Sequence, residues 1–261
     1  MIPAKIDGKP VTQICFPSFY YNKTIISVKI PDSVTLLADS TFERCTSLTS
    51  ISLPQKLDSI GDCTFKDCIS LATITLPDNL TNIGRQAFIN CTSLEHINIP
   101  KGVIEISEEA FYSSGIETSS FEEGIEKLGP YAFAVTNIRT VTLPGSMKEI
   151  SNFAFCACAN LESVVLNEGL TTIKSQAFGG KSKLTKIVIP ASVTEMDERV
   201  FLECNTLQSV KFDGNAPQNY LLEEEKRESY ETLLPDYTIY YHSQASGFTS
   251  PEWYGYPTSI W

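Results

Sequence analysis

The sequence predicts a right-handed solenoid of the β-rich α/β repeat class, and three regular columns of residues indicate it. A pattern of 22 or 23 residues repeats along most of the 261-residue chain, and repeats of this length are typical of solenoids, propellers and arrays. An apolar residue opens each copy: Ile25, Leu48, Leu71, Leu94, Ile116, Ile138, Leu161, Leu184 and Leu207. A phenylalanine recurs with the same spacing: Phe19, Phe42, Phe65, Phe88, Phe111, Phe133, Phe155, Phe178 and Phe201. An aliphatic residue lies five positions before each phenylalanine: Ile14, Leu37, Ile60, Ile83, Ile106, Leu128, Ile150, Ile173 and Met196. Each repeat of a solenoid buries its apolar residues only against its neighbours, so these columns are predicted to form the core.

Each copy is expected to contain one short strand followed by a turn. In Leu48-x-x-Ile51-x-Leu53-Pro54 apolar and polar residues alternate, which is typical of a half-buried strand. Proline ends the strand because it has no N–H to donate to a ladder. Stacked copies then form a parallel sheet, on the concave face of the solenoid. The segment Ile60-Gly61-Asp62-Cys63-Thr64-Phe65 carries a candidate N-cap, which predicts a 3₁₀ or single α-helical turn on the convex side.

The repeat register divides the chain into three predicted parts. Residues 1–24 are a partial first repeat or cap, residues 25–215 are the solenoid, and residues 216–261 are a C-terminal cap. Ile2-Pro3 resembles the end of a strand whose first half is missing, so we expect the chain to be a fragment or a mature form of a longer protein.

The C-terminal cap is predicted to contain a helix, a strand and an aromatic tail. The helix is expected from Gln218 to Leu234 and the strand over residues 237–241. A solenoid needs a cap over its last open coil, and the rings of Trp253, Tyr256 and Trp261 are suited to that role. An exposed aromatic platform for sugar rings is the alternative interpretation of the same tail.

Composition excludes some partners. The net charge of −11 makes nucleic acid a poor partner, because nucleic-acid-binding proteins neutralise phosphates with basic patches. No apolar run reaches the roughly 20 residues that cross a bilayer, and the first residues lack the apolar core of a signal peptide.

Most of the eight cysteines follow the repeat. Five of them lie three residues after a column phenylalanine: Cys45, Cys68, Cys91, Cys158 and Cys204. This regular position favours buried free thiols, since cysteine packs as a small apolar residue; a disulfide or a metal ligand is the alternative. The lone Cys156-Ala157-Cys158 pair lacks the paired spacings of a zinc site, and no metal or cofactor is expected.

The complete motif, Leu-x-x-Ile-x-Leu-Pro-x-x-Leu-x-x-Ile-x-x-x-x-Phe-x-x-Cys, resembles the BspA-like leucine-rich repeats, also called the Treponema pallidum type. The resemblance covers residues 2–215 and implies a leucine-rich-repeat solenoid. It also implies a secreted or cell-surface protein of a host-associated microbe, which adheres to host matrix proteins or to other microbes. Local departures replace the motif cysteine by Ser114, Thr136 and Lys181, and the strand-ending proline by Glu122 and Asn167.

The outward-facing positions of the predicted strands form the candidate binding face. They are mainly serine and threonine, with a charged centre. The candidate ligand-binding residues are Thr73, Thr75, Glu95, His96, Asn98, Glu117, Thr118, Arg139, Thr140 and Thr142. Serine and threonine also suit a merely solvated strand, so a structural spacer in a larger surface protein is the alternative to a binding module. A glycan-binding module that uses the C-terminal aromatics is a third hypothesis.

No catalytic constellation is recognisable. The chain has only two histidines, His96 and His242, and neither has a sequence context that identifies a nucleophile and base pair. Phosphate-binding glycine loops, metalloprotease motifs and calcium loops are also missing from the sequence. The predicted function is therefore a non-enzymatic module that binds a protein ligand.

Overall fold

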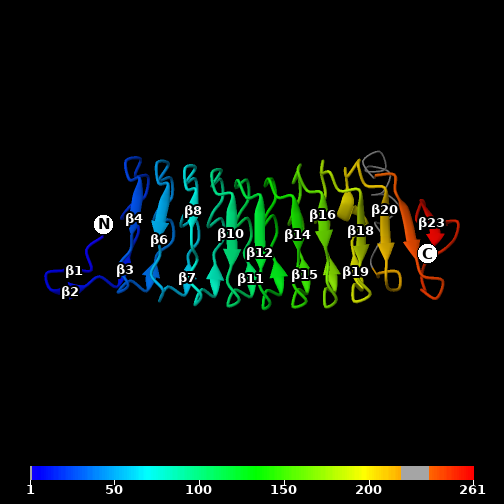
Figure 1. Cartoon of the computed structure of the whole chain (residues 1–261), viewed down its shortest axis with the longest axis horizontal. Helices are drawn as coiled ribbons and strands as arrows, with labels where there is room; N and C mark the ends of the chain where they lie inside the picture. The colour runs from blue at the N-terminus through cyan, green and yellow to red at the C-terminus, as the bar shows by residue number, and fades with distance from the viewer. Residues whose placement is uncertain (1, 219–234) are drawn as a thin grey trace.

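The computed structural model is a rod of stacked coils, with strands crosswise to its long axis (Figure 1). It describes residues 2–218 and 235–261. One strand per coil forms the surface that we call the front sheet. Its repeat strands are β4 Ser27–Lys29, β6 Ser50–Ser52, β8 Thr73–Ile74, β10 His96–Ile99, β12 Thr118–Phe121, β14 Thr140–Thr142, β16 Ser163–Val165, β18 Lys186–Ile189 and β20 Ser209–Phe212. These strands pair in parallel and in register within four successive ladders, β4–β6–β8, β10–β12, β14–β16 and β18–β20, for example Ile97 with Ser119. This arrangement confirms the predicted solenoid.

A second parallel sheet lies on the other limb of the coils, where the sequence suggested no strand. Its nine strands are β3 Gln13–Ile14, β5 Leu36–Leu37, β7 Ser59–Ile60, β9 Asn82–Ile83, β11 Glu105–Ile106, β13 Lys127–Leu128, β15 Glu149–Ile150, β17 Thr172–Ile173 and β19 Glu195–Met196. Each strand has two residues, one outward and one from the aliphatic column. Such short segments show no alternation in the sequence, and the sheet forms because stacking places them side by side.

The expected helical turn before each phenylalanine occurs at one place in the described part of the chain, the 3₁₀ helix η1 Glu198–Phe201, which is capped by Asp197. Elsewhere the limb consists of tight turns with positive φ two residues before and after the phenylalanine, as at Gln86 and Asn90. Alternate N–H groups then reach the next coil: Gln86 N to Glu108 O (3.1 Å), Phe88 N to Ala110 O (2.7 Å) and Asn90 N to Tyr112 O (2.9 Å). In a helical turn the N–H groups bond to carbonyls of the same turn. The tight turns with positive φ therefore give each coil more hydrogen bonds to its neighbour than a helical turn would.

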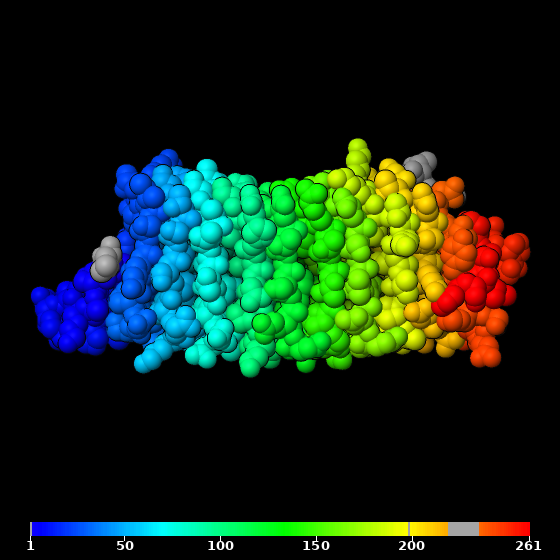
Figure 2. All heavy atoms as spheres, viewed as in Figure 1, coloured from blue at the N-terminus to red at the C-terminus, as the bar shows by residue number. Residues whose placement is uncertain are grey.

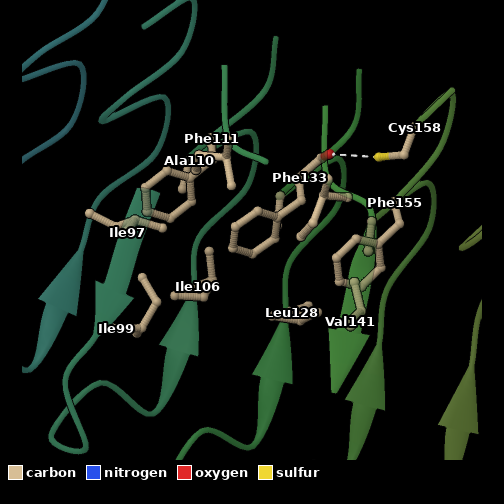
Figure 3. Close-up of a cluster of buried hydrophobic side chains, with 14 of the residues drawn as sticks. Ile97, Ile99, Ile106, Ala110, Phe111, Leu128, Phe133, Val141, Phe155 and Cys158 are labelled. Atoms are coloured by element: carbon tan, nitrogen blue, oxygen red, sulfur yellow. Dashed lines mark hydrogen bonds between the residues drawn. The ribbon is translucent and has the colours of Figure 1, made fainter. Parts of the chain in front are cut away.

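The phenylalanine column forms the centre of the core. From Phe42 to Phe201 every ring is at most 1% exposed. Consecutive rings from Phe19 onward stack with centroids 5.0 to 6.1 Å apart. Figure 3 shows three of them in a row, with the aliphatic residues Ile106 and Leu128 beside them. Because each ring stacks on the ring of the next coil, the core is continuous along the rod.

The cysteine column lies directly beside the phenylalanines. All eight cysteines are free, and the five column thiols are buried, as predicted. Each donates to the carbonyl of the phenylalanine one coil earlier, as Cys158 Sγ does to Phe133 O at 3.2 Å (Figure 3). Where cysteine is replaced, the hydroxyls of Ser114 and Thr136 donate to the phenylalanine carbonyl of their own coil. At these positions the column keeps a small side chain with a hydrogen-bond donor, whereas Lys181, the third replacement, is exposed.

Both ends of the rod carry additional strands. At the N-terminal end β1 Lys5–Ile6 and β2 Lys9–Pro10 form an antiparallel hairpin. At the other end β21 Thr238–Tyr241 pairs with β20, which confirms the predicted strand, and β23 Tyr256–Ile260 pairs with β21 and with β22 Glu252–Trp253. The rings of Trp253 and Tyr256 are buried against Phe212 and Tyr237. The predicted helix falls on residues 219–234, outside the described residues, apart from its first residue.

The phenylalanine column predicts a large loss of stability on truncation. Replacing Phe88 by Ala removes a fully buried ring that is stacked 5.2 Å from a ring on each side. The free energy of unfolding, measured by urea denaturation, should fall by about 3–5 kcal/mol. Thr73→Lys, on an exposed strand position, should leave it nearly unchanged. A loss below about 1 kcal/mol for Phe88→Ala would show that the ring is not part of a packed core.

The column thiols should be unreactive in the folded protein. Burial raises the pKa of Cys45 and Cys158 to about 11 and that of Cys204 to about 12, and it also raises the pKa of Cys68 and Cys91. Because the thiolate is the reactive form, an aromatic disulfide reagent at pH 8 should modify the exposed Cys15 first. Rapid modification of any column cysteine without denaturant would contradict this assignment.

The same thiols predict a loss of stability in alkali. Their folded pKa values lie above the unfolded value of about 8.5, so the unfolded chain releases these protons first. The protonated thiols contribute their full share of the free energy of unfolding at any pH below the unfolded pKa. This contribution is lost as the pH rises through the unfolded pKa toward the folded pKa values. Urea midpoints measured between pH 8 and pH 10 should fall progressively. The fall should be smaller when Cys68 and Cys91 are both replaced by Ser, provided that this variant folds.

Candidate binding face

Two columns of mainly hydroxyl-bearing residues project outward from the front sheet. The first contains Ser27, Ser50, Thr73, His96, Thr118, Thr140, Ser163, Lys186 and Ser209. The second contains Lys29, Ser52, Thr75, Asn98, Ser120, Thr142, Val165, Val188 and Lys211. The residue between them on each strand points inward, as the exposed–buried–exposed pattern of β14 shows. The strand period of two residues thus places both columns on one face.

All ten predicted site residues lie on this face. Nine of them are exposed and Glu117 is half-exposed. They occupy the middle of the rod, in the cyan to green bands of Figure 2. Glu95, Glu117 and Arg139 form a third column beside the first one, at the position just before each strand. The structure therefore brings together residues from four successive coils.

Contacts between coils order the centre of the face. His96 Nδ1 lies 2.6 Å from Thr118 Oγ1, and the Ser120 hydroxyl donates to Asn98 Oδ1. The side chains of Glu117 and Arg139 form an ion pair, with Oε2 and Nε 3.9 Å apart. Both outward columns are thus bridged between β10 and β12.

A hollow of about 410 Å³ lies between these two bridged pairs. Its walls are the pairs His96–Thr118 and Asn98–Ser120, and the inward-column residues Ile74, Ile97 and Ser119 contribute to its lining. It lies beside one of the three interruptions of the front sheet among the described strands: β8 belongs to the β4–β6–β8 ladder, whereas β10 belongs to the β10–β12 ladder. The repeat pattern alone does not predict this hollow.

Ser119 marks an irregularity in the core next to the hollow. The equivalent residues in neighbouring coils are apolar and buried, as Ile97 and Val141 are. The Ser119 hydroxyl is buried and has no hydrogen-bond partner, and Ile74 is only half-buried. The one signal in the sequence was the weak strand pattern of Ile116 to Phe121, which lacks the usual central aliphatic residue.

An adjoining hollow of about 310 Å³ shares Asn98 with the first and is also lined by Asp78, Lys101 and Glu122. Asp78, Glu122 and the nearby Glu95 are exposed. Within the described residues, none of these three carboxylates forms an ion pair. By contrast, Lys127 on the second sheet is 3.7 Å from Glu105 and 3.9 Å from Glu149. The centre of the front face therefore carries negative charge without a local partner.

The geometry of the face suits recognition by hydrogen bonds and charge. Its histidine, His96, contacts a threonine hydroxyl, and the other histidine, His242, packs against the Trp261 ring with centroids 4.1 Å apart. Over residues 2–218 and 235–261 no group of three or more His, Cys, Asp or Glu side chains is arranged to hold a metal ion. Nor does any helix in those ranges have the length and apolar character to cross a membrane.

Comparison with known proteins agrees with this architecture. The model of the BspA type leucine-rich repeat region matches residues 12–138 and 126–221, with six copies. None of the curated proteins compared with the chain matches it significantly.

Two solved structures resemble the rod. A leucine-rich repeat protein from Bacteroides ovatus superposes with a TM-score of 0.76 at 27% identity, over 92% of this chain. The chain spans 62% of the length of that protein. The T. pallidum leucine-rich repeat protein superposes with a TM-score of 0.51 at 28% identity, over 70% of this chain and 76% of its own. The repeat register, the stacked phenylalanine and cysteine columns and the family match lead to one conclusion: this chain belongs to the BspA-type leucine-rich repeat family.

Proposed function

We propose that this chain is a non-enzymatic protein-binding module of a secreted or cell-surface protein, and that its front face adheres to host matrix proteins or to other microbes. The observation that carries the proposal is the pair of outward columns, which repeat their hydroxyls from coil to coil at the spacing of parallel strands, about 4.8 Å. These groups stand on strands whose inward residues between the two columns are buried except for Ile74 and Ser119. A partner therefore meets donors and acceptors that are already ordered, which reduces the entropy cost of binding.

The charged centre gives this face a preferred position for a partner. Hydroxyl columns alone offer the same contacts at every coil, so they do not distinguish one register from the next. Glu95, Glu117 and Arg139 interrupt the uniform surface in the middle of the rod. Charged groups at an interface contribute mainly to specificity and to the rate of association. The candidate face thus combines a long contact surface with one distinct central region.

A structural spacer of a larger surface protein is the second candidate function. It is favoured by the exposed apolar residues at the N-terminal end, where Ile6 is 59% and Phe16 55% exposed. In that case the ends of the rod make the contacts and the front face is only solvated. The glycan-binding hypothesis has less support, because the Trp253 and Tyr256 rings belong to the core of the cap.

The test is binding of the purified chain to immobilised fibronectin, fibrinogen, collagen, laminin and a glycan panel. A variant with Thr73→Lys, Thr118→Lys and Thr140→Lys places three bulky charges on the first outward column. A matched variant with Ser59→Lys, Asn82→Lys and Thr172→Lys adds the same charge to outward positions of the second sheet.

Saturable binding to a protein should be lost in the front-face variant and retained in the second-sheet variant, while both keep the circular dichroism spectrum of the parent chain. Equal binding by all three proteins would place the contact elsewhere. A chain that binds no protein on the panel would favour the spacer.

A further inference from the structure

We propose that the hollow between β10 and β12 receives an arginine or lysine side chain from an extended segment of the partner protein. This inference rests on the proposed function, since it assigns the chemistry of the partner at the centre of the same face. It starts from the hollow in the front face that lies beside one of the interruptions of the front sheet.

The shape of this place differs from that of the rest of the face. The ladder is interrupted between β8 and β10, and a hollow of about 410 Å³ lies beside the interruption. This volume is within the range of small-ligand pockets, about 300–1,000 Å³, so one long side chain fits with room for water. The adjoining hollow at Asn98 extends the depression toward the strand ends.

The lining combines apolar and polar groups in a way that suits a long cationic side chain. Ile74 and Ile97 provide apolar surface, against which the methylene groups of arginine or lysine can pack. The walls present oxygen acceptors, among them Thr118 Oγ1 and Asn98 Oδ1. Arginine and lysine carry five and three N–H donors and no acceptor, which matches a lining rich in oxygen.

The charged side chains around the hollows favour an occupant with a positive charge. The carboxylates of Asp78 and Glu122 line the adjoining hollow, and Glu95 directly precedes His96, which lines the first one. Within the described residues none of these three carboxylates forms an ion pair. Glu117 is neutralised by Arg139, and Lys101 is the basic residue in the lining of the adjoining hollow. The local formal charge is −2, from the four carboxylates of Asp78, Glu95, Glu117 and Glu122 and the two basic side chains of Lys101 and Arg139.

The charges change sign toward the ends of the face. Lys29 lies on the outward columns near the N-terminal end, and Lys186 and Lys211 lie on them near the C-terminal end. A basic group is therefore attracted to the centre and repelled from both ends, which fixes the register of the bound segment. The overall charge of −11 also speeds the approach of a basic partner.

The probe is a short synthetic peptide of glycine, serine and threonine with two central arginines, together with twins in which citrulline or glutamate replaces the arginines. Binding to the ¹⁵N-labelled chain is followed by the shifts of its amide resonances. The arginine peptide should shift the resonances of residues 95–98 and 117–120, and the citrulline peptide should bind about tenfold more weakly. The glutamate peptide should cause no shift.

Two charge variants separate a site from general attraction. Asp78→Asn with Glu95→Gln and Glu122→Gln removes the three unpaired carboxylates around the hollows. The matched control is Asp32→Asn with Asp58→Asn and Asp213→Asn, which removes the same charge at exposed positions elsewhere; Asp32 occupies the same turn position as Asp78, two coils earlier. The first variant should bind the arginine peptide about tenfold more weakly, and the control should bind it nearly as well as the parent chain.

The results distinguish this inference from the proposed function. Equal weakening by both variants, or shifts spread along the whole rod, would overturn the assignment of the hollow. If a matrix protein binds through the front face and the carboxylate variant binds it as well as the parent chain, the inference is wrong and the proposed function stands. If no panel protein binds but the arginine peptide shifts only the hollow, the proposed function loses its support and the site remains.

Discussion

The hydrogen bonds between successive coils are the constraint on which the rest of this structure depends. Every coil must place its backbone N–H groups opposite the carbonyls of a neighbour on two sheets and along the phenylalanine limb. This requirement explains why the limb forms turns with positive φ at residues such as Gln86 and Asn90, although side chains there cost some free energy. Three bonds to the next coil compensate for that conformation. Stacking also aligns the phenylalanine rings, so packing and hydrogen bonding depend on the same register.

Where the repeat motif departs from its pattern, hydrogen bonds restore the contact between coils. Among the copies that lack the proline after the front strand, two have Glu122 and Asn167 in its place. In each, the following glutamate accepts two backbone N–H groups of the next coil. Glu123 accepts from Gly145 and Ser146, and Glu168 accepts from Ala191 and Ser192. These carboxylates are committed to the structure, unlike those of Asp78 and Glu95, which makes the latter pair the better candidates for contact with a partner.

The centre of the front face is where this compensation is incomplete. Ser119 replaces an aliphatic residue, its hydroxyl has no partner, and the ladder is broken one coil earlier. A buried polar group without a hydrogen bond destabilises the fold, and sites that break local rules are often functional. The same region carries the histidine, the ion pair and the unpaired carboxylates. The irregularity and the chemistry of the face therefore coincide in the middle of the rod.

The sequence by itself determined the coil length, the core columns and the outward columns, because each repeats a local pattern that stacking leaves unchanged. Seven of the ten residues proposed for the binding face could be assigned by alternation along a strand, which decides which side chains face outward. Glu95, Glu117 and Arg139 lie just before the strands and are assigned from their shared position in the repeat. Only the tertiary structure decided the second sheet, the turns of the phenylalanine limb and the hollow beside Ser119. These features depend on the distance and the pairing between coils, as between β8 and β10. A local pattern carries no signal of such pairing, which is why the N-cap expected at Asp62 wrongly predicts a helical turn there.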